Sequence, residues 1–531
     1  MNIYGCSLQW WRLATLVTCG AALSTVGCGA ATAPLIDDFG EEAPGGGDAA
    51  VSDGGSEASR SDGAAFDASA DSGTDGGPDG GADTGSGVGP DGGADTGSSV
   101  GPDGGDGSTA CPGVSGQNPA YFVDPIHGSD STGTGNNSTS PQCALQTITR
   151  ALEIVGSSPR PHTTIDVVGG TTETEVVTIR GVATGTPSAG QELFPLTIGS
   201  NVTLTTSTGP VTIEVPPNLP GGATTGLVLE GNPSAIVGGT GAALTIDGQT
   251  QTAGVGVTVQ SPGASLSFVT IQNFADDGIE VSDLGDVAST LAIGPGVQSN
   301  GNVTDGLLVT GSSTATITAT SGVPIQFNAN GAHGVRVTGT GVITLTGSVG
   351  AEPPSSSTIV ASGNGGAGIW VQTSARTQST ITGTVSTGST EGNGIRIIPG
   401  SNVKVRGCWV LGNSRGNGID IEDVTGATAA SVADIDLGSR TSAGANVLQA
   451  VSGSNPNGGA GICLKLPGGS AAELDAQGNM FQAGVNCATT ARVLKTTSTN
   501  ACAAGADVGG TIAAFPGGAG DTIDVGMCSY R

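Results

Sequence analysis

The sequence predicts an all-β solenoid, in which the chain winds through a stack of β-coils. The main observation is a unit of glycine, aliphatic residue, any residue and aliphatic residue that occurs nine times between Gly226 and Leu464. The unit returns every 24 to 43 residues, and its alternation is that of a strand with one buried face. The nine glycines are Gly226, Gly254, Gly278, Gly306, Gly334, Gly368, Gly394, Gly418 and Gly461.

The composition agrees with such a fold. Aromatic residues make up 3% of the 531 residues and charged residues 11%, whereas glycine occurs 95 times, which suits short strands joined by many turns. The net charge of −29 argues against nucleic acid and anionic membrane surfaces as partners. About half of this charge lies in residues 37–110, so the acidity belongs largely to one segment.

Residues 1–27 have the features of an export signal. Arg12 precedes an apolar stretch from Leu13 to Val26, which is too short to span a bilayer stably. The pair Gly27-Cys28 resembles the end of a bacterial lipoprotein signal, in which the cysteine after the cleavage site receives lipid. This resemblance implies a lipid anchor on Cys28 and a location at the bacterial outer membrane or cell surface. An ordinary secretory signal is the alternative.

Residues 28–110 are of low complexity and repeat Gly-Pro-Asp-Gly-Gly from Gly77, Gly89 and Gly101. This segment has almost no apolar residue to bury, so nothing offsets the entropy that ordering it would cost. We therefore expect a flexible acidic tether. Calcium-binding repeats are the alternative, but they need aliphatic residues between the acids, and these are missing here.

Residues 111–160 are predicted to cap the N-terminal end of the solenoid, where apolar core and unpaired strand edges need a cover. Cys111 and Cys143 flank this region, and export favours a disulfide between them. A short helix is expected because four apolar residues have helical spacing: Ile148, Ala151, Leu152 and Val155.

The cap also carries a recognisable pattern: Val123-Asp124, Gly128, Asp130, Gly133, Pro141, Thr147-Ile148 and Ala151-Leu152. This pattern resembles the opening of a bacterial family of right-handed parallel β-helix domains of unknown function, within the pectate-lyase-like superfamily. The resemblance covers about residues 111–531 and implies a right-handed parallel β-helix over 161–531. It implies no reaction, because no known reaction defines the family.

Within the repeats, the first and third residues after each glycine are expected to face inward and to stack on their counterparts in the next coil. Asparagines recur four or five residues before several of the glycines. Stacked amides can bond to one another along the coil axis, so we predict an asparagine ladder. Its expected members are Asn273, Asn302, Asn330, Asn364 and Asn413.

Cysteines gather near the C-terminal end of the chain. Cys463, Cys487, Cys502 and Cys528 permit three pairings, and the sequence does not choose among them. Export favours two disulfides, for which we predict Cys463–Cys487 and Cys502–Cys528 as a seal on this end. Cys408 is then left as a buried free thiol at an inward position.

The residues just before the repeat glycines form a first candidate site. If the coils stack in register, Asp277, Asp305 and His333 are neighbours on three successive coils. Two adjacent carboxylates split their pKa values, as a general acid and a general base require. Polygalacturonases share the expected fold and use catalytic acids on adjacent coils, but their further motifs have no counterpart here. Asn393 and Asn417 occupy the same position, so the alternative is a plain preference for polar residues before a turn glycine.

The second residue after each glycine forms another candidate site, because it should point outward. Trp370 then lies between Arg336 and Arg396 on adjacent coils, and Asp420 follows. An indole flanked by guanidinium groups can stack on a sugar ring and pair with uronate or sulfate. The alternative is decoration of the sheet by cation–π contacts and by an ion pair between Arg396 and Asp420.

No cofactor or metal site is predicted, since the histidines are isolated and no Cys-x-x-Cys motif occurs. The function that we expect is a non-catalytic, lipid-anchored surface or adhesion module that contacts extracellular polysaccharide through Arg336, Trp370 and Arg396. A polysaccharide lyase or glycoside hydrolase acting on acidic glycans through Asp277, Asp305 and His333 is the main alternative. A structural stalk is a third possibility.

Overall fold

A computed structural model describes residues 111–480 with gaps, together with residues 493–496 and 522–524. The gaps fall at 137–139, 171–174, 218–224, 251, 321, 349–357, 391, 423–431, 440, 449–456, 459–460 and 466–472. The predicted signal, the lipidated Cys28 and the tether all lie outside the described residues. No helix in the described ranges is long and apolar enough to cross a membrane.

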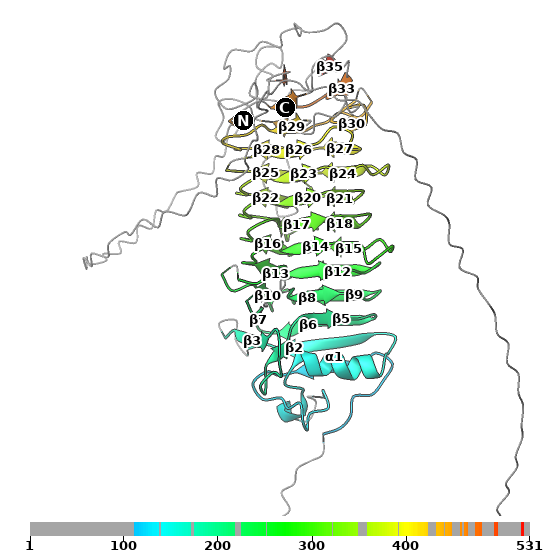
Figure 1. Cartoon of the computed structure of the whole chain (residues 1–531), viewed down its shortest axis with the longest axis vertical. Helices are drawn as coiled ribbons and strands as arrows, with labels where there is room; N and C mark the ends of the chain where they lie inside the picture. The colour runs from blue at the N-terminus through cyan, green and yellow to red at the C-terminus, as the bar shows by residue number, and fades with distance from the viewer. Residues whose placement is uncertain are drawn as a thin grey trace, which may run out of the picture. The chain divides into compact units, whose positions relative to one another are not determined.

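The chain forms a right-handed parallel β-helix with three long sheets, which confirms the predicted fold class (Figure 1). The first sheet contains β1 (Ala120–Val123), β2 (Thr163–Val168), β6 (Val202–Thr208), β9 (Ser234–Val237), β12 (Ala264–Ser267), β15 (Thr290–Ile293), β18 (Thr314–Thr318), β21 (Val342–Thr346), β24 (Ser379–Thr382), β27 (Val403–Arg406), β30 (Ile435–Asp436), β33 (Glu473–Asp475) and β35 (Thr522–Asp524).

The second sheet contains β3 (Val177–Val182), β4 (Glu192–Leu193), β7 (Val211–Glu214), β10 (Leu244–Asp247), β13 (Val269–Gln272), β16 (Gln298–Asn300), β19 (Ile325–Gln326), β22 (Ile359–Ser362), β25 (Thr384–Thr387), β28 (Trp409–Leu411) and β31 (Val447–Leu448). The third sheet contains β5 (Leu196–Ile198), β8 (Leu227–Leu229), β11 (Val257–Val259), β14 (Ile279–Val281), β17 (Leu307–Val309), β20 (Val335–Val337), β23 (Ile369–Val371), β26 (Ile395–Ile397), β29 (Ile419–Glu422), β32 (Ile462–Lys465) and β34 (Val493–Thr496).

Each coil visits the three sheets in the same order, as β12, β13 and β14 do, and its strands pair in parallel with those of the next coil. On the third sheet, Val257, Ile279, Leu307, Val335 and Ile369 lie in register and are all buried. The residues predicted to face inward therefore form the core. Their continuous contact along the axis removes apolar surface from water at every coil.

An asparagine ladder runs through the turns between the second and third sheets. The side-chain amide of Asn302 donates to Oδ1 of Asn330 at 3.0 Å, and the amide of Asn330 donates to Oδ1 of Asn364 at 3.1 Å. Further along the axis, Asn413 donates to Asn457 at 2.8 Å. All five side chains are buried, so the ladder satisfies polar groups that water does not reach.

Asn273 is not a member of this ladder, contrary to the prediction. It has a φ of 62° and lies at the left-handed turn position that Gly301 occupies in the next coil with a φ of 68°. The following residue, Phe274, takes the ladder position, and its backbone N–H donates to Asn302 Oδ1 at 3.1 Å. Asparagine tolerates the left-handed conformation better than other non-glycine residues, which explains its presence there.

The N-terminal cap contains α1 (Ile148–Ser157), and residues 141–143 form a single 3₁₀ turn. Thr147 caps the helix by accepting from the Arg150 N–H at 3.1 Å. Glu192 from β4 accepts from the N–H groups of Ile148 and Thr149 at 2.7 and 2.8 Å, which ties the helix to the solenoid. The predicted capping helix is confirmed.

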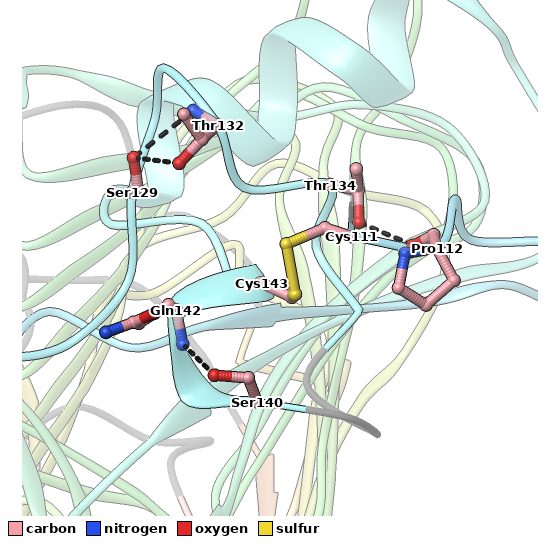
Figure 2. Close-up of a disulfide and its surroundings, with 8 residues drawn as sticks. All are labelled: Cys111, Pro112, Ser129, Thr132, Thr134, Ser140, Gln142 and Cys143. Atoms are coloured by element: carbon pink, nitrogen blue, oxygen red, sulfur yellow. Dashed lines mark hydrogen bonds between the residues drawn. A yellow bond between two sulfur atoms is a disulfide. The ribbon is translucent and has the colours of Figure 1, made fainter. Parts of the chain in front are cut away.

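Cys111 and Cys143 form the predicted disulfide, with their Cα atoms 5.3 Å apart (Figure 2). The Thr134 hydroxyl donates to the Pro112 carbonyl at 2.6 Å beside it. Cys408 is a buried free thiol, as predicted. Cys463 takes part in a disulfide, while Cys487, Cys502 and Cys528 lie outside the described residues, so the two predicted C-terminal pairings stay predictions.

Replacement of Asn330 by alanine tests the ladder. The change leaves the Asn302 amide and the Ser299 carbonyl without their partner at Asn330, and we expect the free energy of unfolding to fall by about 3 kcal/mol. Chemical denaturation measures the loss. Asn328→Ala is the matched control on the same coil, because the Asn328 side chain is only half-buried. If Asn328→Ala lowered the free energy of unfolding as much as Asn330→Ala, the ladder would not make the special contribution to stability that we expect.

Candidate functional site

The sequence suggested two separate sites: a column of residues just before the repeat glycines and a column of outward residues two places after them. The two columns meet on the third sheet. Arg336 Nη1 lies 3.6 Å from Asp305 Oδ2, and the rings of His333 and Trp370 have centroids 4.5 Å apart. One member of each pair precedes a repeat glycine and the other follows it. The turn before the strand and the outer face of the strand therefore belong to one cluster.

Arg336, Trp370 and Arg396 form what we call the arginine–tryptophan stack. They lie in register on β20, β23 and β26, as predicted. The guanidinium carbons of Arg336 and Arg396 lie 4.7 and 5.2 Å from the centre of the indole. Because the two arginines come from coils on opposite sides of Trp370, they cover opposite faces of its ring. The indole is thus held between two cations, and neither face is open to stack on a sugar.

His333 packs its ring edge-on against Trp370, at an interplanar angle of 76°. Its Nδ1 accepts a hydrogen bond from the Ala367 N–H at 2.8 Å, so the neutral ring carries its proton on Nε2. Burial, together with the charges of Arg336 and Arg396, lowers the pKa of His333 to about 4. His333 is therefore neutral at neutral pH.

Asp277 and Asp305 lie on adjacent coils, as the sequence suggested, and both are buried. Asp277 Oδ1 accepts from the Asp305 N–H at 2.9 Å, and Asp305 Oδ1 accepts from the His333 N–H at 3.0 Å. In the same column, Asn393 Oδ1 accepts from the Asn417 N–H at 2.6 Å. Each of these side chains thus binds the backbone of the next coil, a role that an asparagine fills as well as an acid.

The two carboxyl groups are nevertheless unusual in their titration. Burial and, after it, the neighbouring Asp277 raise the pKa of Asp305 to about 7, although Arg336 opposes the rise. Burial also raises the pKa of Asp277, against hydrogen bonds from Thr304 and the Asp305 backbone. The pair therefore holds a proton in a range of pH where exposed carboxyl groups are ionised.

Asp420 is in register with Arg396 and alternates with the core residues Ile419 and Ile421, but it is covered and not exposed as expected. Its side chain is fully buried, and it accepts hydrogen bonds from the amides of Asn393 and Asn417 at 3.0 and 2.9 Å. Cys463, in the same column on the next coil, is also buried. The outer position at this end of the third sheet is therefore enclosed, and the amides of Asn393 and Asn417 satisfy the buried carboxylate.

Thr304 is a residue of the cluster that sequence reasoning missed. Its hydroxyl donates to Asp277 and lies 3.0 Å from Oδ1 of Asp276. The only feature of the sequence that could have indicated Thr304 is its position directly before Asp305, which itself precedes a repeat glycine. No group of three or more His, Cys, Asp or Glu side chains that could hold a metal occurs within the described part of the chain.

No family model and no curated protein matches this chain. Among solved structures, the AlgE6 A-module of mannuronan C-5 epimerase from Azotobacter vinelandii is similar over 72% of this chain and 94% of that chain, with 12% identity and a TM-score of 0.35. The AlgE4 A-module from the same organism is similar over 66% and 94%, with 13% identity and a TM-score of 0.36. This likeness says nothing about activity.

The raised pKa of Asp305 has a consequence for stability. Between about pH 4 and pH 7, native Asp305 keeps a proton that the unfolded chain releases, so its contribution to stability is lost as the pH rises through 7. We expect the unfolding free energy of the wild-type chain to fall over this interval relative to Asp305→Asn, which keeps the acceptor for the His333 N–H. Denaturation at a series of pH values measures the difference.

His333→Asn is a control for which we expect the opposite change of unfolding free energy with pH. The pKa of His333 is lowered from 6.5 to about 4, so the native ring binds fewer protons than the unfolded one in this interval. The wild-type chain should therefore gain stability relative to His333→Asn as the pH rises from about 4 to 6.5. Equal pH profiles for the wild-type chain and both variants would contradict the assigned ionisation states.

Proposed function

We propose that this protein is a non-catalytic surface module that binds acidic polysaccharide through the arginine–tryptophan stack. The observation that carries the proposal is the pair of guanidinium groups fixed against Trp370. Arginine pairs with planar anionic groups through two parallel hydrogen bonds, so uronate and sulfate are suitable partners. Because each guanidinium is held in place before binding, little side-chain entropy is lost when an anion arrives.

The protonation states support this choice. At neutral pH His333 is uncharged, and Asp305 titrates close to this pH, which leaves the charge of Arg336 only partly compensated. The side chain of Arg336 is about one-third exposed, whereas that of Asp305 is 1% exposed. An anion approaching from solvent would meet the cation and not the acid.

The contact with sugar differs from the one expected from the sequence. Both faces of the indole are occupied by the guanidinium groups, so Trp370 acts as a brace between two cations. Recognition then depends on charge and on hydrogen bonds to the arginines, and less on stacking. We expect acidic glycans to be preferred over neutral ones for this reason.

A polysaccharide lyase or glycoside hydrolase remains the second candidate, because Asp277 and Asp305 share a site and both have raised pKa values. Two features favour the binding module over the enzyme. Asp277 and Asp305 are only 5% and 1% exposed, and the carboxyl group of each binds a backbone N–H of the next coil. A general acid or base needs to reach the substrate, and these groups are committed to the fold.

We further propose that the module is displayed at the bacterial outer membrane or cell surface through lipid on Cys28, with residues 28–110 as an acidic tether. The support is the sequence alone: an apolar segment that ends in Gly27-Cys28, followed by a long segment without residues to bury. A tether of this composition suits a module that reaches for polymer beyond the membrane.

Binding of an acidic glycan panel, including oligogalacturonate and sulfated oligosaccharides, tests the module. We expect Arg336→Gln and Arg396→Gln each to weaken binding about tenfold, because each removes a charged hydrogen-bonding partner. Trp370→Ala should weaken it by a similar factor by freeing both arginines. Titration calorimetry at low and high salt measures these changes.

Arg160→Gln is the matched control, since it also removes one exposed positive charge but lies after α1 in the N-terminal cap and not on the third sheet. A loss for Arg160→Gln as large as for Arg396→Gln would mean non-specific attraction and would sink the proposal. Release of unsaturated uronide or reducing ends that disappears in Asp305→Asn would establish the enzyme instead. Neither binding nor turnover would leave the structural stalk.

The anchor has a separate test. Radiolabelled palmitate supplied to cells should label the wild-type protein, and Cys28→Ala should remain unlabelled because the acceptor thiol is gone. Processing of the wild-type precursor should also be sensitive to globomycin. Labelling of Cys28→Ala, or normal processing with globomycin present, would point to an ordinary secretory signal.

A further inference from the structure

A second surface, on the first sheet, has its own binding features. Its outer face carries threonines in two in-register columns across β18, β21 and β24. The columns contain Thr316, Thr344 and Thr380 in one, and Thr318, Thr346 and Thr382 in the other. Neighbouring hydroxyls repeat at about 4.8 Å along the axis, the spacing of paired strands.

A cavity of about 550 Å³ lies at one edge of this array. This volume falls within the range of small-molecule sites, about 300–1,000 Å³. Arg376 and Gln378 contribute charged and amide groups, and Val342 and Ala375 contribute apolar contact. Six hydroxyl side chains also line the cavity: Ser312, Thr314, Thr340, Thr344, Ser374 and Thr377.

One wall of the cavity is the connection 372–378 that leads into β24. The corresponding connections into β18 and β21 are shorter, covering residues 310–313 and 338–341, and Figure 1 shows the chain projecting at β24. The wall is braced by Asn402 on the next coil. Its amide donates to the Arg376 carbonyl at 2.8 Å, and its Oδ1 accepts from the Gln378 amide at 3.1 Å.

The base of the same connection is fixed from the coil below. The Thr373 hydroxyl donates to the Gly341 carbonyl at 2.7 Å and accepts from the Ala375 N–H at 3.0 Å. Bonds to the coils on both sides hold the wall in one conformation before a ligand arrives. Such preorganisation reduces the entropy that binding costs.

The charge of the cavity sets it apart from the rest of the chain. None of its lining residues is acidic, although the net charge of the chain is −29. The Arg376 guanidinium is exposed and forms no ion pair with any carboxylate in the described part of the chain. A negative group at Arg376 would thus meet a cation. The carboxylate of Asp283 also lies beside the cavity, where it accepts from the N–H and the hydroxyl of the lining residue Ser312 at 2.8 and 3.0 Å.

We propose that this cavity is a second glycan site, which takes a hydroxyl-rich sugar segment carrying one acidic group at Arg376. Hydroxyl side chains both donate and accept hydrogen bonds, as sugar hydroxyls do. The threonine columns continue from the cavity over the exposed face of the sheet, so a polymer could extend onto them from the cavity. The site is on a different sheet from the arginine–tryptophan stack and does not depend on the function proposed for that stack.

The test is calorimetric titration of the exported chain with tetrasaccharides of two kinds, oligogalacturonate and uncharged cello-oligosaccharide. Arg376→Ala should weaken oligogalacturonate binding about tenfold and leave any binding of the neutral sugar unchanged. Thr344→Val keeps the β-branched shape but removes a lining hydroxyl, and it should weaken both several-fold. Titrations in a background that carries both Arg336→Gln and Arg396→Gln, which removes both cations of the arginine–tryptophan stack, read this site separately from the stack.

Thr178→Val is the matched control, because Thr178 is exposed on β3 of the second sheet and belongs neither to the cavity nor to the threonine columns. Its affinities should equal those of the wild-type chain. The proposal is overturned if no tetrasaccharide binds in the background that lacks both arginines of the stack, or if Arg376→Ala and Thr178→Val have the same effect. Equal binding of acidic and neutral sugars would overturn the role of Arg376.

Discussion

The structure depends on one constraint, the register between parallel coils. A shift by one residue would turn every inward aliphatic side chain to solvent, so the register is fixed wherever one face is buried. Val257, Ile279 and Leu307 show this, each lying on its counterpart in the next coil. The buried amides of Asn302 and Asn330 also favour this register, because each donates a hydrogen bond to the asparagine at the same position on the next coil.

The same register determines the chemistry of the surface. Outward positions on successive strands are about 4.8 Å apart, which is close enough for a guanidinium to cover an indole. Arg336, Trp370 and Arg396 make contact for this reason, although they are far apart in the sequence. The threonines on the first sheet are aligned by the same geometry. Chemically distinct columns can therefore line one solenoid without disturbing its core.

Polar side chains beside the turns serve the backbone first. Asp277 and Asp305 each accept an N–H from the next coil, and His333 does the same through Nδ1. Their shifted pKa values arise mainly from burial and follow from this structural role without any need for catalysis. Unusual titration in a β-helix is thus weak evidence for an active site unless the group is also open to a ligand.

The sequence by itself determined the coil, the inward positions, the capping helix and the disulfide between Cys111 and Cys143. These features depend on local periodicity or on chain connectivity, which a sequence displays directly. It also placed Trp370 between two arginines, since register follows from the glycine repeat. It misplaced Asn273, because a left-handed turn residue and a ladder residue differ by one position.

Only the tertiary structure decided what surrounds each side chain. It covered both faces of Trp370, buried Asp420 and joined the aspartate column to Arg336. It also formed the cavity beside Arg376 from three successive coils, where no motif marks the residues. Burial, charge contacts and cavities depend on distances between coils, and these are properties of packed side chains that a repeat in the sequence does not contain.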